Sequence, residues 1–135
     1  MMINSRSLDE LLPRTKDKAL RLIANCATVG IDLIVTSTYR DTESQDALYA
    51  QGRTLPGKRV TNVRGGRSFH NHRVALDVVP VVNGKAIWDD QAMWSRVGAM
   101  GMMCGLEWGG AWPTFKDMPH FQDTNGLTID DYIKG

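Results

Sequence analysis

Two short segments contain all three histidines of the chain, and each segment also contains an aspartate. His70 and His72 precede Asp77, and His120 follows Asp117 by three residues. Neutral imidazoles and carboxylates are the usual ligands of a catalytic zinc ion, which keeps three protein ligands and one open position. Asp77 also interrupts the apolar run VALDVV, where a carboxylate is costly unless it is paired or bound to a cation. These residue types could therefore form a metal site.

The spacing of the residues leaves alternatives open. His70 and Asp77 are seven residues apart, so one flat strand would place them on opposite faces, and they converge only if the chain turns near residues 71–73. Spacing does not distinguish His70 from His72, and an ordinary strand with a solvent-facing Asp77 is the alternative to a metal site. The tripeptide His70-Asn71-His72 is not a nuclease signature, because that motif is spread along a ββα unit.

Arg40 is a third candidate for chemistry, at the carboxyl end of a segment rich in β-branched residues. An arginine at this position could bind a carboxylate or stabilise an oxyanion. A solvated surface arginine is the alternative, and the sequence leaves both open.

Periodicity and turn signals predict one small α+β domain covering residues 1–135. Apolar residues at three- and four-residue spacing indicate amphipathic helices, β-branched alternation indicates strands, and Asn83-Gly84 is typical of a hairpin turn. Residues 53–67 contain four Gly or Pro residues and little periodicity, which predicts a long loop. The expected helices cover 14–28, 42–51, 90–104 and 128–134, with a short one after Ser7, and the expected extended segments cover 31–38, 74–82, 85–88, 106–108 and 119–122.

Composition argues against several classes of function. The chain has 135 residues and a net charge of +1, which argues against a charge-driven nucleic-acid binder, although cations clustered in space could still form a patch. No apolar stretch is long enough to span a membrane, and the first residues lack the apolar core of a signal peptide. Cys26 and Cys104 lie in apolar contexts and are expected to be buried free thiols.

The ordered motifs of the chain resemble those of zinc peptidases that cut peptidoglycan stem peptides. This family includes D-alanyl-D-alanine carboxypeptidases and phage L-alanyl-D-glutamate endopeptidases. The similarity extends from about residue 35 to residue 122, and three further segments resemble the endopeptidase branch. The matching segments are Ser68–Asp77 (its S-x-H-x-x-G-x-A-x-D motif), Asp117–Phe121, Thr38–Arg40, Gln45–Thr54 and Gly105–Gly110.

The resemblance implies a role for each matching residue. It selects His70 rather than His72 and implies a zinc ion bound by His70, Asp77 and His120, in a cleft on an antiparallel sheet flanked by helices. It further implies Asp117 as general base and Arg40 as the group that stabilises the polarised carbonyl oxygen. The implied substrate contacts are Ser68, Gln45 and Trp108.

Two positions depart from the family motifs. Arg73 stands where the motif has glycine, which raises a question about the local turn and about access to the cleft. Asp117 stands where many relatives have glutamate, whose longer side chain places the carboxylate differently.

The resemblance also implies a function for the whole chain. The expected activity is zinc-dependent hydrolysis of the L-Ala–D-Glu bond by a monomeric endolysin that waits in the host cytoplasm, without a signal peptide, until the membrane is permeabilised. Its partner would be bacterial peptidoglycan, with no nucleic acid, no stable membrane insertion and no separate cell-wall-binding domain. The alternatives are a D-Ala–D-Ala carboxypeptidase and a non-enzymatic, zinc-stabilised cell-wall-binding module.

Overall fold

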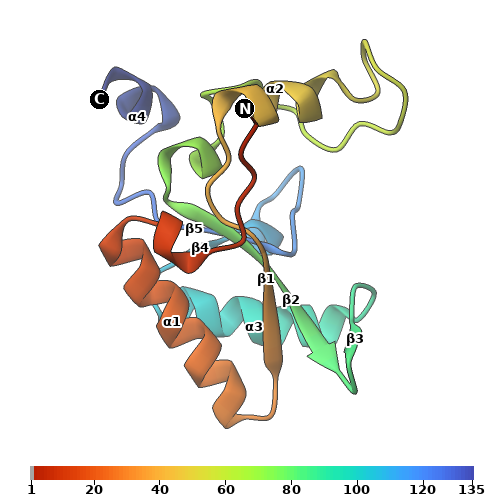
Figure 1. The fold of residues 1–135 in the computed structure, drawn as a ribbon. Coiled ribbons are helices and arrows are strands. Elements are labelled where there is room, and N and C mark those ends of the chain that lie inside the picture. Colours follow the sequence, from red (N-terminus) through yellow and green to blue (C-terminus); the bar gives the residue numbers. More distant parts are fainter. Residues whose placement is uncertain (1) are drawn as a thin grey trace.

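The computed structural model of the chain describes residues 2–135 as an antiparallel sheet with helices at its faces and ends (Figure 1). This arrangement confirms the predicted α+β class. The α-helices are α1 (Pro13–Thr28), α2 (Thr42–Ala50), α3 (Gln91–Met103) and α4 (Ile129–Lys134), with 3₁₀ helices η1 (Leu8–Glu10), η2 (Phe69–His72) and η3 (Gly109–Ala111). The strands are β1 (Asp32–Ser37), β2 (Ala75–Val82), β3 (Lys85–Ala86), β4 (Glu107–Trp108) and β5 (His120–Gln122).

The sheet is built around β2. Its strands run in the order β1-β2-β5-β4, β3 pairs with the end of β2, and every pairing is antiparallel. The predicted hairpin joins β2 to β3, and Asn83 and Gly84 both have positive φ, 52° and 78°, as a two-residue turn of the I′ type requires. Because β2 has a strand on both sides, its residues are the fixed frame on which the rest of the sheet is positioned.

The core lies between the sheet and the helices α1 and α3. The predicted amphipathic face of α1 buries Ala19, Leu22 and Cys26, and α3 contributes Trp94 and Val97. Cys26 is buried and Cys104 half-buried, both as free thiols. Within residues 2–135, no helix is both long and apolar enough to cross a membrane.

The other end of the molecule carries α2, α4 and the predicted long loop. Residues 52–67 form no helix or regular strand and extend beyond α2, in the upper part of the view in Figure 1. The 3₁₀ helix η2 follows this loop and was not expected from the sequence. It begins with a capping box in which the Ser68 hydroxyl accepts a backbone N–H bond and Asn71 returns the contact.

Arg73, which stands where the family motif has glycine, adopts a left-handed backbone conformation that glycine favours. Its φ of 65° and ψ of 27° are left-handed and end η2. Its guanidinium stacks 3.8 Å from the Tyr39 ring and bonds the backbone and side-chain oxygens of Glu10. The side chain therefore points towards η1 and is not part of the pocket described below, so the substitution does not obstruct the cleft.

Arg73→Gly is expected to be more stable than Arg73→Ala by about 1 kcal/mol, because only glycine occupies this conformation without a steric cost. Both variants lose the same contacts to Glu10 and Tyr39, so the difference isolates the backbone. Urea unfolding of the two variants measures it. Equal stabilities would show that the left-handed conformation carries no cost here.

Candidate active site

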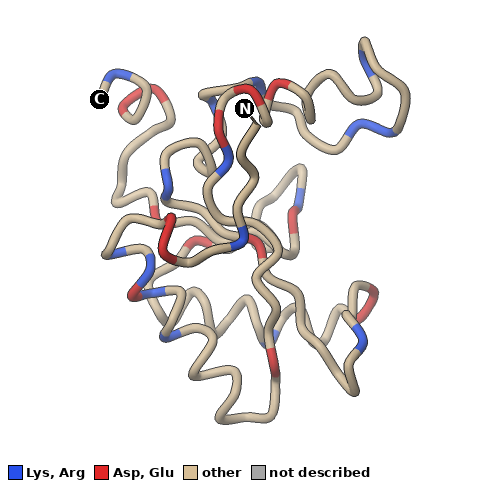
Figure 2. The backbone as a smooth tube through the Cα atoms, viewed as in Figure 1, with Lys and Arg blue, Asp and Glu red and all other residues tan. Residues whose placement is uncertain are grey.

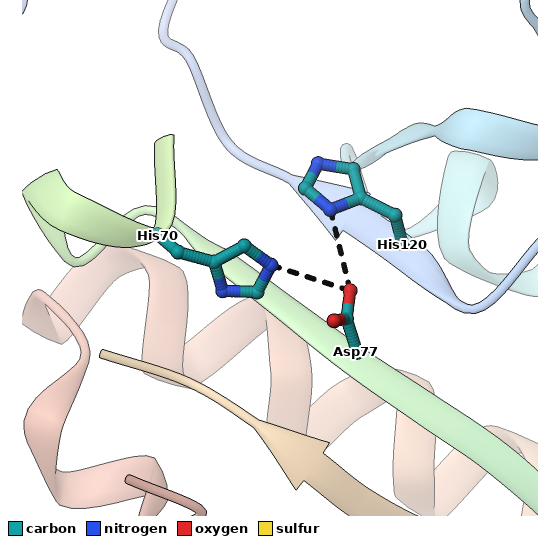
Figure 3. A group of neighbouring side chains, drawn as sticks. All are labelled: His70, Asp77 and His120. Atoms are coloured by element: carbon teal, nitrogen blue, oxygen red, sulfur yellow. Dashed lines mark hydrogen bonds and ion pairs between the residues drawn. The ribbon is translucent and has the colours of Figure 1, made fainter. Parts of the chain in front are cut away.

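His70, Asp77 and His120 come together on the sheet, with both imidazoles directed at the carboxylate (Figure 3). Asp77 in β2 and His120 in β5 are directly opposite each other in the antiparallel register. His70 reaches the same point from η2, because the chain turns between residues 70 and 75. One donor atom from each residue lies within 4.8 Å of the others, and His70 Nε2 and His120 Nδ1 are each 3.3 Å from Asp77 Oδ1.

In each imidazole, the ring nitrogen that does not face Asp77 lies within hydrogen-bonding distance of an oxygen atom. His70 Nδ1 lies 2.8 Å from the Thr38 carbonyl oxygen, and His120 Nε2 lies 2.7 Å from Gln122 Oε1. An N–H donated to these acceptors leaves the other ring nitrogen free as a ligand facing Asp77. The sequence reasoning missed both acceptors. A signal for Gln122 existed, because residues two apart in a strand share one face of the sheet.

The electrostatics of the cluster favour an ionised carboxylate. Burial by itself raises the pKa of the Asp77 carboxyl, but attraction and hydrogen bonds from His70 and His120 outweigh burial and hold this pKa far below its ordinary value. Burial lowers the pKa of the His120 imidazole, and its bonds to Asp77 and Gln122 outweigh that effect and leave the pKa raised. The cluster therefore presents one negative charge between two imidazoles.

The donor set fits a zinc ion. Two imidazole nitrogens and one carboxylate oxygen are a ligand set of catalytic zinc sites, which keep a further position open. Among residues 2–135 no other His, Cys, Asp or Glu joins this group, so neither cysteine closes it. The side chains of His70 and His120 are 4% and 9% exposed but that of Asp77 is 22% exposed, so the cluster is open on the Asp77 side.

Gln122→Leu is expected to weaken zinc binding by about 10–100-fold, because it removes the acceptor that orients the His120 ring. Gln122→Glu keeps an acceptor at this position and is the matched control, with an affinity close to that of the unmodified chain. Competition with a chromophoric chelator measures all three affinities. Unchanged affinity of the leucine variant would remove Gln122 from the metal-orienting role.

Arg40 lies beside the cluster, just after β1. Its terminal nitrogens donate to Gln45 Oε1 at 2.8 Å and to Ser37 Oγ at 3.1 Å, while its buried Nε has no hydrogen-bond partner among the described residues. Burial lowers the pKa of the guanidinium, and the nearby Asp77 and Asp117 carboxylates oppose that shift. A fixed cation that lines the pocket is suited to stabilising negative charge on a substrate.

Gln45 and Trp108 were predicted to contact the substrate, but neither side chain lines the pocket. Gln45 is fully buried, and its amide joins Arg40 to the backbone oxygen of Val63 in the long loop. Trp108 is 9% exposed, and its indole N–H donates to the carbonyl of Met118 at 2.7 Å. Both side chains therefore hold site-bearing segments in place, and neither lines the pocket.

Asp117 lines the same pocket from the turn before β5. Loss of water around the carboxyl raises its pKa, and Asp77 raises it further, while the two imidazoles and Arg40 lower it. The turn is seated on Gly109, whose carbonyl accepts the Asp117 N–H at 3.1 Å. A Cβ on Gly109 would lie 2.4 Å from the Asp117 carbonyl oxygen, so only glycine permits this approach.

Gly109→Ala is expected to lower kcat by up to about 10²-fold with little change in KM, because the added methyl group displaces the turn that carries Asp117. Gly65→Ala is a matched control, since its Cβ would lie 2.5 Å from another backbone oxygen, that of Thr42, and neither glycine has a positive φ. Both variants lose folding stability, but only the first is expected to lose kcat, measured with a soluble stem peptide. Equal kcat values for the two variants would contradict this role of Gly109.

Ser68 and His72 have different positions relative to the cluster. Ser68 lines the pocket, and its hydroxyl accepts the His70 backbone N–H at 3.2 Å. His72 faces away, with Nε2 2.8 Å from the Gly66 carbonyl oxygen and its ring against Tyr132 of α4. The structure thus brings Ser68, and not His72, to the site.

The cluster opens into a pocket of about 1120 Å³. Ligand pockets for small molecules measure about 300–1,000 Å³, so this space suits a longer ligand such as a peptide. Its walls come from the end of β1, the long loop, η2, the first turn of α4 and residues 112–117. Trp112 lies against the His120 ring, with 5.4 Å between ring centroids, and gives the pocket an aromatic surface beside the cluster.

Comparison with protein families and known sequences finds peptidases that are similar to this chain. A family model described as D-alanyl-D-alanine carboxypeptidase matches residues 61–123. The peptidoglycan L-alanyl-D-glutamate endopeptidase CwlK of Bacillus subtilis is 39% identical over 122 residues, which cover 84% of this chain and 73% of CwlK. The L-alanyl-D-glutamate peptidase of Listeria phage A118 is 33% identical over 144 residues, covering 97% of this chain but only 46% of that protein.

Comparison with solved structures also finds peptidases that are similar to this chain. The Serratia marcescens L-Ala D-Glu endopeptidase ChiX aligns with a TM-score of 0.63 and 26% identity, covering 97% of this chain and 92% of ChiX. The vancomycin resistance D,D-pentapeptidase VanY, solved as a mutant with Zn(II), aligns with a TM-score of 0.63 and covers 91% of this chain and 83% of VanY. At 16% identity the VanY match establishes a shared fold only.

Proposed function

We propose that this chain, which belongs to the D-alanyl-D-alanine carboxypeptidase family of metallopeptidases, is a zinc-dependent endopeptidase that hydrolyses the L-Ala–D-Glu bond of peptidoglycan stem peptides. The observation that carries the proposal is the His70–Asp77–His120 cluster, open on the side that faces a peptide-sized pocket. The choice of bond is supported by CwlK, which is 39% identical and is named for that activity.

His70, Asp77 and His120 would hold the zinc ion, with Thr38 and Gln122 orienting the two imidazoles. Bound there, zinc supplies Lewis-acid chemistry, which polarises a carbonyl group and makes water a nucleophile near neutral pH. The ionised Asp77 balances part of the metal's charge. The cysteines take no part, which fits a catalytic site better than a closed structural one.

The remaining chemistry comes from Asp117 and Arg40. The Asp117 carboxylate accepts a proton from the attacking water and then delivers it to the nitrogen of the leaving D-Glu, so the peptide bond breaks with no net change in the enzyme. Arg40 places its positive charge beside the scissile carbonyl, where negative charge develops in the transition state. Ser68 contacts the substrate from the η2 side of the pocket.

The proposed biological role is that of an endolysin. A phage peptidase is among the relatives, although the chain spans less than half of its length. Such an enzyme is made in the host cytoplasm and reaches the cell wall once the membrane has been permeabilised. Residues 1–135 would provide its catalytic domain.

A D-Ala–D-Ala carboxypeptidase is the second candidate, because the matching family model carries that description. Mass spectrometry of purified peptidoglycan digested by the chain separates the two candidates. New amino-terminal D-Glu supports the endopeptidase, and released D-Ala in its place supports the carboxypeptidase. Unfolding on zinc removal, with no peptide product before removal, would instead indicate the zinc-stabilised wall-binding module.

A further inference from the structure

The long loop concentrates positive charge that the composition of the whole chain conceals. Residues 52–67, here called the basic loop, contain five of the 16 basic residues and none of the 15 acidic residues. The rest of the chain therefore has a net negative charge although the whole is +1. In Figure 2 the loop that extends beyond α2 carries blue segments and no red one. The five cations are Arg53, Lys58, Arg59, Arg64 and Arg67.

Internal ion pairs compensate little of this charge. Of these five cations, only Arg67 has a carboxylate partner within the described part of the chain, the exposed Asp130 at 3.2 Å. Lys58, Arg59 and Arg64 are exposed, and Arg53 donates to the backbone oxygens of Tyr49 and Thr61. Like charges crowded in one loop repel each other, so the unbound protein pays an electrostatic cost that a bound anion would remove.

Most of the contacts that hold the basic loop in place do not involve its exposed cations, and the exception is Arg59 Nε, which donates to the Gly52 carbonyl at 3.4 Å. Gln45 bonds the Val63 carbonyl, Gln51 bonds the Lys58 carbonyl, and Asp46 accepts the Gly65 N–H, each within 2.9 Å. Arg53 ties the loop to the end of α2 through Tyr49. The side chains of Lys58 and Arg64 take no part in these hydrogen bonds, although that of Arg64 contacts the Tyr49 ring.

The basic loop has one side on the pocket and another side away from it. Arg59, Arg67 and residues 60–63 line the pocket that contains the metal cluster. On the other side, Arg53 and Arg64 flank the Tyr49 ring, with guanidinium carbons 3.8 and 5.2 Å from its centroid, beside a second, shallower hollow of about 270 Å³. A long anion could thus bind outside the pocket while a peptide occupies it.

We propose that the basic loop is a docking surface for a phosphodiester polymer of the bacterial cell wall. Four of its five cations are arginines, whose planar guanidinium groups match phosphate oxygens in bidentate geometry. A repeating polyanion can contact several of these cations at once, whereas a single carboxylate can contact only one or two. Docking here would bring the pocket to the wall without contributing to hydrolysis.

The test compares two variants of equal net charge. Lys58→Gln/Arg64→Gln removes two cations from the basic loop, neither of which lines the metal-containing pocket. Arg21→Gln/Lys85→Gln removes two exposed cations on α1 and β3, away from the loop (Figure 1). Each pair is placed in an Asp117→Asn background so that the wall is not digested, and sedimentation with purified walls measures binding. Poly(glycerol phosphate), polyglutamate and duplex DNA serve as soluble competitors.

The loop variant is expected to bind walls about tenfold more weakly, with a shallower dependence on salt, while the control pair binds like the parent. Poly(glycerol phosphate) should displace the protein better than polyglutamate or DNA, and walls stripped of phosphodiester polymers should bind poorly. Equal binding by the two variants, undiminished binding to stripped walls, or stronger displacement by DNA would each overturn the proposal. Hydrolysis of a soluble stem peptide, without the Asp117 change, should be equal in all variants, and its absence from the unmodified chain would overturn the proposed activity alone.

Discussion

Asp117→Asn is expected to reduce stem-peptide hydrolysis by about 10²–10⁴-fold, the usual contribution of a general base, without weakening zinc binding. The amide is nearly isosteric with the carboxylate but cannot accept the proton of the attacking water. Asp117 is not part of the ligand cluster, and its backbone bonds to Gly109 and His120 do not involve the side chain. The variant should therefore fold and bind metal like the parent.

The pH dependence of the unmodified enzyme also tests whether Asp117 is the general base. Only the ionised carboxylate acts as a base, so activity is lost as the pH falls through the pKa of Asp117. Because desolvation raises that pKa, the acidic limb of kcat/KM should lie above the ordinary value for an aspartate. Asp117→Glu restores a carboxylate and should retain more activity than Asp117→Asn. Equal hydrolysis by Asp117→Asn and the parent would assign the base to another group.

The sequence contained the ligand set because the chemistry itself restricts the residue types. Few residue types bind zinc, and a carboxylate within the apolar run that forms β2 is costly without a partner. Spacing did not decide between His70 and His72, and only the family resemblance selected His70. The hairpin at Asn83-Gly84 and the face of α1 were also predictable, since each depends on residues close together in the chain. Even the left-handed turn at Arg73 had a signal, because the family motif has glycine at that position.

Contacts made through tertiary packing were not predictable in the same way. The motifs identified Gln45 and Trp108 as relevant but not their positions, since their burial behind the pocket depends on how α2, the basic loop and β4 pack. Thr38 acts through a backbone oxygen, which residue type does not reveal. The composition likewise concealed the basic loop, because a net charge averages over the whole surface.

Asp123 is the clearest residue that sequence reasoning missed. It follows β5 directly and is 3% exposed, yet its carboxylate is held from three positions on α1. Thr15 Oγ1 donates to it at 3.1 Å, Lys18 Nζ lies 2.7 Å from it, and Arg14 Nε lies 3.2 Å from it. Residues more than 100 positions apart form this network, so no local pattern predicts it.

Asp123→Asn is expected to lower the free energy of unfolding by about 3 kcal/mol, because it removes the buried anion and leaves two cations without their partner. The cations are partly exposed, with side chains 38% and 30% accessible, which keeps the loss at the lower end for a broken buried pair. Asp17 is an exposed aspartate on α1, the helix that carries both cations. The Asp17→Asn variant is therefore the control, and its free energy of unfolding should change by less than about 0.5 kcal/mol. Urea unfolding measures both variants.

The effect of Asp123→Asn should also reach the metal cluster. Asp123 anchors the end of β5 to α1, and β5 carries His120 and its acceptor Gln122. Loss of the anchor should therefore weaken zinc binding more than Asp17→Asn does, even at temperatures where both variants are folded. If Asp123→Asn were destabilised but bound zinc like the control, the network would hold α1 to the sheet without positioning the site.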